Sequence, residues 1–321
     1  MCAGCITGMI GHADPTDEAI FSYIGLIGYD RLGSVGIPPA YALLMKLCAE
    51  FTGDIRIFCA LNGCIQSVLA GLYIYTGCSR PYAGAVMLSA GFMPASFVGT
   101  PFFTAVLICC CAMRYIRERR FFRFAAMILA AACFDISAVL LIPLYFITLI
   151  PNVYITAVIS AAAASLAAIY SDITASVFSF LGFSLTVSLK STVPCAVCAC
   201  LAALICLLMH RMIANRDEKY AYLIPFAAMG AALSAAGVHN GMLFPVSVFL
   251  LAGSLTSLAP EVYELLLRFF GILFPKKPYT VGLAVNTACF AAVIGFCAYT
   301  LFSGCFGSEV FGQALFGEGT L

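Results

Sequence analysis

The chain has 321 residues, of which 63% are hydrophobic and 10% are charged, and its mean hydropathy is +1.04. An average soluble domain is about 45–50% apolar and about 25% charged, so this composition excludes an ordinary soluble protein and predicts an integral membrane protein. The formal net charge is only +1 and the basic residues cluster in short segments, so we expect no nucleic-acid partner.

Apolar residues form continuous runs and do not alternate with polar ones, which favours membrane helices over membrane strands. One span needs about 20 apolar residues, so the chain has room for roughly eight to ten transmembrane helices. We therefore predict an all-α, polytopic integral membrane protein that also carries one or two interfacial amphipathic helices.

The basic residues set the expected orientation of the spans. Five arginines and one glutamate precede a 27-residue apolar run at residues 124–150, which is typical of a cytoplasmic loop because Lys and Arg resist translocation. The members of this cluster are Arg114, Arg117, Glu118, Arg119, Arg120 and Arg123. A second basic cluster, at residues 210–219, is also expected in the cytoplasm. Counting crossings from the two clusters places these segments outside: residues 1–54, Pro151, Lys190, His239 and the C-terminal tail.

The first 54 residues are expected to form an extracytoplasmic lead-in. Within it, residues 36–52 begin with two prolines, which a helix tolerates at its start, and then place Lys46 and Glu50 four apart among apolar residues. This pattern predicts an amphipathic helix at the membrane interface, or a shallow re-entrant one.

A multi-span membrane domain is predicted over residues 55–302, followed by a polar tail at residues 303–321. Its expected spans are residues 55–78, 81–98, 101–116, 124–150, 152–170, 171–189, 194–212, 222–238, 241–258 and 281–302. Residues 260–278 mix five charged side chains with apolar ones, which predicts an interfacial helix on the cytoplasmic face.

The run at residues 124–150 is too long for a simple span, because a helix of that length measures about 40 Å whereas the hydrocarbon core is ~30 Å thick. It must therefore tilt, break or lie partly flat. Aspartate is a favoured N-cap, and Ser137 follows Asp135, so we predict a break near Asp135. An isolated carboxylate is costly in hydrocarbon, so Asp135 is expected to face the bundle interior or a water-filled cavity.

The 17 cysteines lie mostly inside apolar runs, where cysteine behaves as a small hydrophobic residue. Cys2 and Cys5 form a CxxC pair, but no second pair or adjacent histidine completes a zinc set. We expect no disulfide framework, no metal site and no cofactor.

Three blocks of residues resemble the EpsG family, membrane proteins related to the Wzy-type polymerases of bacterial exopolysaccharide and O-antigen assembly. The first block has Asp17 with Phe21 four residues on, and the second has Pro39 and Tyr41 before an apolar helix. The third block contains the following matching residues: Tyr115, Phe134, Ser137, Ala138, Pro143, Leu144 and Tyr145. The order of the blocks carries the resemblance, and Asp135 stands where the family has a histidine.

The resemblance implies a polymerase that joins polyprenyl-pyrophosphate-linked oligosaccharides at the outer face of the bacterial cytoplasmic membrane. Such chemistry needs a base for the acceptor hydroxyl and cations for the pyrophosphate. The candidate catalytic residues are Asp135 and Asp17. The candidate substrate-binding residues are Arg31, Tyr41, Arg56 and His239. The expected partners are the lipid-linked glycan, the lipid bilayer and other polysaccharide-assembly membrane proteins.

Each candidate residue also has a simpler structural role, and two other functions of the protein remain possible. The simpler roles are a helix cap for Asp135, a solvated loop acid for Asp17, surface ion pairs of Arg31 with Asp30 and of Arg56 with Asp54, an interfacial position for His239 and an interface anchor for Tyr41. Two other functions stay open, namely a transporter or flippase of lipid-linked sugars and a catalytically inactive scaffold for polysaccharide synthesis. A transporter is expected to show inverted repeats and paired broken helices.

Overall fold

The structure is a computed structural model that describes residues 15–82, 84–85, 88, 101–147, 150, 152–170, 176, 189–210, 213, 222–238 and 243–273. Every regular element in these ranges is a helix, which confirms the all-α prediction for this part of the chain. The elements are α2 (Pro15–Leu26), the 3-10 helix η1 (Tyr29–Ser34), α3 (Pro39–Phe51), α4 (Ile55–Gly77), α6 (Pro101–Arg117), α7 (Phe121–Ala132), the 3-10 helix η2 (Ile136–Leu140), α8 (Leu141–Ile147), α9 (Val153–Ile169), α11 (Leu189–Leu208), α14 (Ile224–Ala236) and α15 (Leu243–Leu273).

Two of the described helices are long and apolar enough to cross a bilayer, judged by length and composition alone. They are α4 and the Pro245–Leu265 segment of α15. Their surroundings differ, because only 33% of the α4 span is buried inside the protein, whereas 78% of the α15 span is buried. α4 therefore presents a broad apolar surface, and α15 lies in the core.

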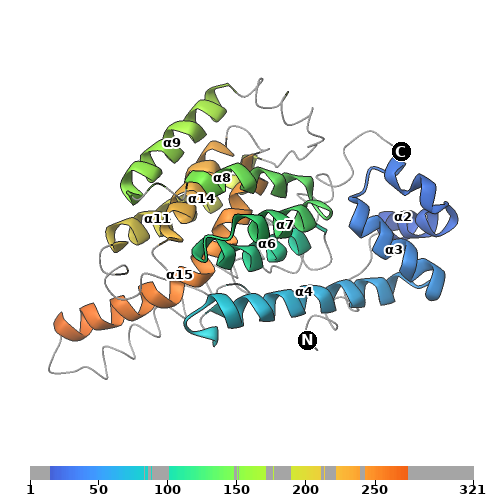
Figure 1. Cartoon of the computed structure of the whole chain (residues 1–321), viewed down its shortest axis with the longest axis horizontal. Helices are drawn as coiled ribbons and strands as arrows, with labels where there is room; N and C mark the ends of the chain where they lie inside the picture. Colours follow the sequence, from blue (N-terminus) through green and yellow to red (C-terminus); the bar gives the residue numbers. More distant parts are fainter. Residues whose placement is uncertain are drawn as a thin grey trace.

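The first three elements form a small unit at one end of α4, on the right in Figure 1, which we call the N-terminal unit (Pro15–Phe51). α2 and α3 pack side by side around a buried core that includes Ile24, Ala42 and Met45. Pro38 is the N-cap of α3 and Pro39 is its first residue, where a helix tolerates proline. The helix predicted at residues 36–52 is confirmed.

The remaining helices pack around α6, whose residues from Pro101 to Met113 are all buried. α4, α7 and α15 contact α6, while α14 lies against α9, α11 and α15. Helices at the rim expose large apolar side chains, among them Leu72 and Tyr75 on α4, Val158 and Ile169 on α9, and Leu201 and Leu208 on α11. Extensive exposed apolar surface of this kind is typical of contact with a membrane.

α4 and α6 run parallel, because their contacts advance together along both sequences. In the middle of α4, Gln66 Nε2 donates to Thr104 Oγ1 at 3.0 Å. One turn farther along α4 and two turns farther along α6, the Cys111 thiol donates to the carbonyl of Leu69 at 3.5 Å. The sequence analysis predicted this parallel course, since both helices were expected to cross from the outer to the inner side.

The segment predicted as one span at residues 124–150 forms two arms that lie back to back. The first arm is α7, and the second arm consists of η2 and α8; together we call them the hairpin. Its second arm returns to the start of the first, where the Tyr145 ring centroid lies 5.2 Å from that of Phe121 and 5.3 Å from that of Phe124. The predicted break near Asp135 is confirmed, and the chain after it turns back along α7 and does not continue in one direction as we expected of a single span. Asp135 lies at the tip, because the chain turns back after it.

The return of the hairpin changes where the next helix, α9, begins. At the start of α9, the Tyr154 ring packs edge-on 5.7 Å from the ring of His210, which follows α11. Near the other end of α9, Ala164 packs with Ala236 at the end of α14. The start of α9 therefore lies beside His210, whereas we predicted the two at opposite ends of the bundle.

α15 runs without interruption from Leu243 to Leu273 with Pro260 inside it, so the separate helix predicted to begin at Pro260 is wrong. Proline has no N–H, so the carbonyl of Thr256, four residues earlier, lacks its helical donor. The thiol of Cys78, the residue after α4, donates to that carbonyl at 3.8 Å. A neighbouring helix thus replaces the missing bond, and the placement of this segment on a membrane face stays a prediction.

The end of α4 holds α15 on both sides of this proline. Before it, the buried Tyr73 hydroxyl donates to the carbonyl of Gly253 and lies 2.6 Å from Ser257 Oγ. After it, Arg80 forms an ion pair with Glu264. The later residue, Arg80, contacts the later part of α15, and the earlier residue, Tyr73, contacts the earlier part. α4 and α15 therefore run in the same direction.

Several predicted segments fall outside the described residues. These are residues 1–14, most of 81–98 and 171–189, the span at 281–302 and the tail at 303–321. α11 begins at Leu189, so Lys190 lies in its first turn and not, as predicted, in a loop that precedes the next span.

Candidate functional site

Two of the sequence blocks meet at the tip of the hairpin. The backbone N–H of Ala40, in the first turn of α3, donates to the carbonyl of Cys133 at 3.0 Å. Ala40 stands between Pro39 and Tyr41, and Cys133 precedes Asp135 by two residues. This bond therefore joins the second block to the third and docks the N-terminal unit on the hairpin.

Phe58 on α4 connects the first block to the second. Its ring centroid lies 6.0 Å from that of Phe21 and 5.2 Å from that of Tyr41, which packs edge-on. Phe58 is only 2% exposed, whereas Tyr41 is half-buried. The three aromatic residues therefore fix the N-terminal unit against α4 and leave part of the Tyr41 side chain accessible.

Asp135 caps the second arm of the hairpin. Its Oδ1 accepts a hydrogen bond from the N–H of Ser137 at 2.9 Å and another from the Ser137 hydroxyl, which confirms the predicted cap. Its Oδ2 makes no hydrogen bond to any described residue, and the side chain is only partly buried. The cap therefore orients the carboxylate through Oδ1, while Oδ2 stays without a hydrogen bond to the described residues.

The two candidate arginines lie on exposed surfaces of the N-terminal unit and of α4. Arg31 on η1 has a side chain that is 77% exposed and lies 4.0 Å from the carboxylate of Asp30, so the predicted surface pair is confirmed. Arg56 is exposed in the first turn of α4, and its backbone N–H donates to Asp54 Oδ1 at 2.8 Å. Asp54 is thus the N-cap of α4. Both guanidinium groups face solvent.

Asp17 is the third residue of α2, so it belongs to a helix and not to the loop that we considered. His239 lies outside the described residues, and its predicted role remains untested. No group of three His, Cys, Asp or Glu side chains within the described ranges lies close enough to hold a metal ion.

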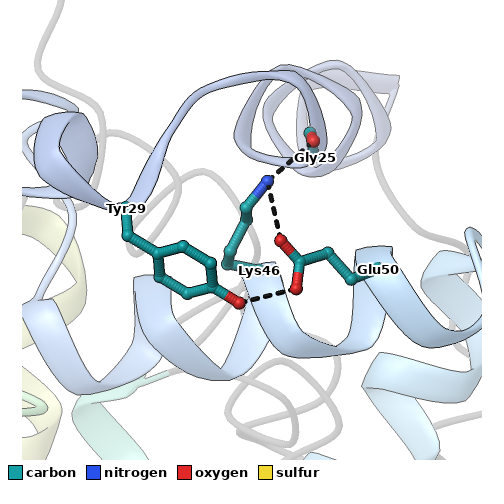
Figure 2. A network of polar contacts seen from close by, with 4 residues as sticks. All are labelled: Gly25, Tyr29, Lys46 and Glu50. Carbon is teal, nitrogen blue, oxygen red and sulfur yellow. Dashed lines mark hydrogen bonds and ion pairs between the residues drawn. The ribbon is translucent and has the colours of Figure 1, made fainter.

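The structure reveals a buried lysine that the sequence analysis placed at the membrane interface (Figure 2). Lys46 Nζ donates to the carbonyl of Gly25 at 2.9 Å and pairs with Glu50 Oε1 at 3.2 Å, and its side chain is only 7% exposed. The Tyr29 hydroxyl donates to Glu50 Oε2 at 2.6 Å. The polar face of α3 is therefore covered by α2 and η1, and Lys46 ties the three elements together.

This network shifts the ionisation of its members. The pKa of Glu50 is lowered, first by the hydrogen bond from Tyr29 and then by Lys46. The pKa of Tyr29 is raised, mainly because its hydroxyl donates to Glu50. The four-residue spacing of Lys46 and Glu50 was the available sequence signal for an ion pair on one helix face.

Comparison with known proteins agrees with the sequence blocks. The EpsG family model matches residues 18–192, more than half of the chain. The matched segment contains α3, the arginine cluster and the whole hairpin, while Asp17 precedes it by one residue and His239 lies beyond it. No curated protein and no solved structure matches the chain. The chain therefore belongs to the EpsG family, which indicates a membrane protein related to exopolysaccharide synthesis.

Proposed function

We propose that this protein is a glycan polymerase that joins oligosaccharides carried on polyprenyl pyrophosphate at the outer face of a bacterial cytoplasmic membrane. The family supports a role in exopolysaccharide synthesis. One observation carries the proposal: the hydrogen bond between Ala40 and Cys133 gathers the sequence blocks around Asp135.

The course of the helices supports a site on the outer side. The arginines between α6 and α7 belong in the cytoplasm by the positive-inside rule. From there α7 rises through 12 residues, or about 18 Å, which is more than half of the ~30 Å hydrocarbon core. The hairpin tip then meets the N-terminal unit through Ala40, so this unit lies on the side away from the arginines. Irregular backbone at such depth is tolerated where it is covered by protein or lines a cavity.

In this proposal Asp135 is the general base. Its Oδ2 accepts the proton of the acceptor sugar hydroxyl, while Ser137 holds Oδ1 and fixes the orientation of the carboxylate. The hydroxyl oxygen forms a bond to the anomeric carbon of the donor sugar, the bond from that carbon to the pyrophosphate oxygen breaks, and polyprenyl pyrophosphate leaves with the bonding electron pair.

The other candidates serve the substrate. Arg31 and Arg56 are exposed cations on the same side of the bundle, and they would neutralise charge on the leaving pyrophosphate. Tyr41 keeps part of its side chain accessible beside the docked block and would contact a sugar. Asp17 is the second candidate base, and His239 is a further candidate phosphate ligand.

Asp135→Asn tests the proposal, because asparagine is also a good N-cap but cannot accept the proton. We expect polymer formation to fall by about 10²–10⁴-fold while the thermal stability of the protein is unchanged. Asp54→Asn is the matched control, since Asp54 caps α4 through the N–H two residues on, as Asp135 caps η2. Wild-type polymer yield and length from Asp135→Asn would remove Asp135 from the chemistry.

A flippase of lipid-linked sugars is the second candidate, because transporters contain discontinuous helices and the segment at Asp135 is interrupted, although it is the one such break that we identify in the described residues. The location of the unpolymerised units separates the two functions. An inactive polymerase leaves lipid-linked oligosaccharides at the outer face, whereas an inactive flippase leaves them at the inner face. If Asp135→Asn changes neither the polymer nor the location of its precursor, the scaffold function is favoured.

A further inference from the structure

We propose that the turn between α6 and α7 binds anionic phospholipid headgroups. We call residues 114–123 the arginine turn; they include five arginines and one glutamate, a net charge of +4. The inference rests on the membrane location of the chain and not on polymerase activity. Its failure therefore leaves the assignment of Asp135 untouched.

The backbone of the arginine turn places an arginine where glycine is favoured. The N–H of Arg120 donates to the carbonyl of Tyr115 at 2.9 Å, and the N–H of Arg119 donates to that of Ile116 at 3.0 Å. This pair of bonds is the Schellman motif, whose left-handed residue is usually glycine. Here that residue is Arg119, with φ 53°, and no other non-glycine residue in the described ranges has a positive φ. The turn thus carries a charge at a position where an L side chain is disfavoured.

Most of these charges are directed outward. Arg117, Arg119 and Arg123 are exposed, and no ion pair joins any of them to another residue of the described structure. Arg120 pairs with Glu118 at 3.3 Å. Three guanidinium groups of the arginine turn therefore have no ion-pair partner among the described residues, and their mutual repulsion makes an external anion favourable.

Arg114 adds a donor beneath this surface. Its guanidinium carbon lies 4.6 Å from the centre of the Tyr115 ring, and it donates to the Tyr115 hydroxyl at 2.5 Å. Its Nε is buried and has no hydrogen-bond partner among the described residues. Arg114 therefore adds a further positive charge beneath the exposed arginines, which increases their attraction for phosphate.

Exposed aromatic side chains flank the arginines. Phe122 is 85% exposed, and Phe146, brought back by the second arm of the hairpin, is 54% exposed and packs 5.3 Å from Phe121. Exposed rings beside unpaired arginines suit both layers of a lipid surface. The rings enter the boundary of the acyl chains, and the guanidinium groups contact the phosphates. A net charge of +4 selects an anionic leaflet over a zwitterionic one.

The experiment uses the absence of tryptophan from the sequence. Phe122→Trp introduces a single fluorescent reporter into the full chain, which is reconstituted in phosphatidylcholine nanodiscs that contain increasing amounts of brominated phosphatidylglycerol. Bromine quenches indole emission at close range. We expect half-maximal quenching at a lower mole fraction of brominated phosphatidylglycerol than of brominated phosphatidylcholine, and removal of each arginine should raise that fraction about fivefold.

Phe51→Trp is the matched control, because Phe51 ends α3 on the N-terminal unit and is 84% exposed. Its quenching should be the same for both brominated lipids. Arg119→Gly removes a charge and also suits the left-handed backbone, so it should weaken the preference for phosphatidylglycerol without lowering the melting temperature. This variant distinguishes loss of binding from loss of folding.

Two results would overturn the proposal. One is equal quenching of Trp at position 122 by the anionic and the zwitterionic brominated lipid. The other is a preference for phosphatidylglycerol that survives the combined substitution of Arg117, Arg119 and Arg123 by glutamine, since the surface would then not depend on these charges.

Discussion

The Cys78 thiol donates a hydrogen bond to the carbonyl of Thr256 at 3.8 Å, although the two residues belong to different helical segments. The acceptor is the carbonyl that Pro260 leaves without a donor inside α15. Cys78 therefore allows a helix to continue through a residue that normally interrupts it. The nearby contacts of Tyr73 and Arg80 hold α15 before and after the same point.

Cys78→Ala should lower the free energy of unfolding by about 1 kcal/mol, because the carbonyl of Thr256 loses its donor. In a Pro260→Ala background the same substitution should cost close to nothing, since the new alanine supplies the N–H. Thermal unfolding of the four proteins in detergent completes a double-mutant cycle. Equal costs in both backgrounds would show that the thiol acts through another contact, such as Ser257 at 3.9 Å.

Tyr73→Phe should destabilise the protein by about 1 kcal/mol, because it removes the buried hydroxyl that donates to the carbonyl of Gly253 and lies 2.6 Å from Ser257 Oγ. Tyr75→Phe is the matched control on the same helix, since Tyr75 is 81% exposed. Its melting temperature should equal that of the wild type. Equal stability of the two variants would mean that the Tyr73 hydroxyl does not fasten α4 to α15.

The Glu50 network predicts a pH dependence of the N-terminal unit. The pKa of Glu50 is lowered, first by the hydrogen bond from Tyr29 and then by Lys46, so its contribution is complete above the unfolded pKa of about 4.3. This contribution is lost as the pH falls through the lowered pKa. The pKa of Tyr29 is raised by the same bond, so its contribution is complete below about pH 10 and is lost as the pH rises through the raised pKa.

Glu50→Gln should therefore be less stable than the wild type near neutral pH, and the difference in melting temperature should shrink in acid. Glu18→Gln, at an exposed acid on α2, should show no such convergence. If the difference in melting temperature between Glu50→Gln and the wild type stays constant down to about pH 3, the substitution does not act through the charge of Glu50.

The hairpin predicts that the chain enters and leaves the membrane on the same side between Arg120 and Asn152. Reporter fusions after Ile147 and after Asn152 should both report the cytoplasm, and a fusion after Tyr170 should report the opposite side. The reason is that Tyr145 packs against Phe121 at the start of the first arm. A fusion after Asn152 that reports the outer side would instead support the single crossing expected from the sequence.

The sequence was sufficient for the positions of several helices, because local features set them. The double proline placed the start of α3, the apolar run placed α4, and Asp135 with Ser137 placed the break of the hairpin. The blocks that resemble the EpsG family were also visible in the sequence and were confirmed by the family match. Apolar length and helix caps act within a few residues, which is why these predictions did not need a three-dimensional structure.

The tertiary structure decided directions and partners. An N-cap at Asp135 ends one helix, but only the packing of Tyr145 on Phe121 shows that the next one turns back. Likewise, Pro260 reads as a helix boundary until Cys78 supplies the missing donor from another helix. The meeting of the blocks depends on hydrogen bonding and aromatic packing between residues far apart in the chain, and no local pattern of residue types encodes such contacts.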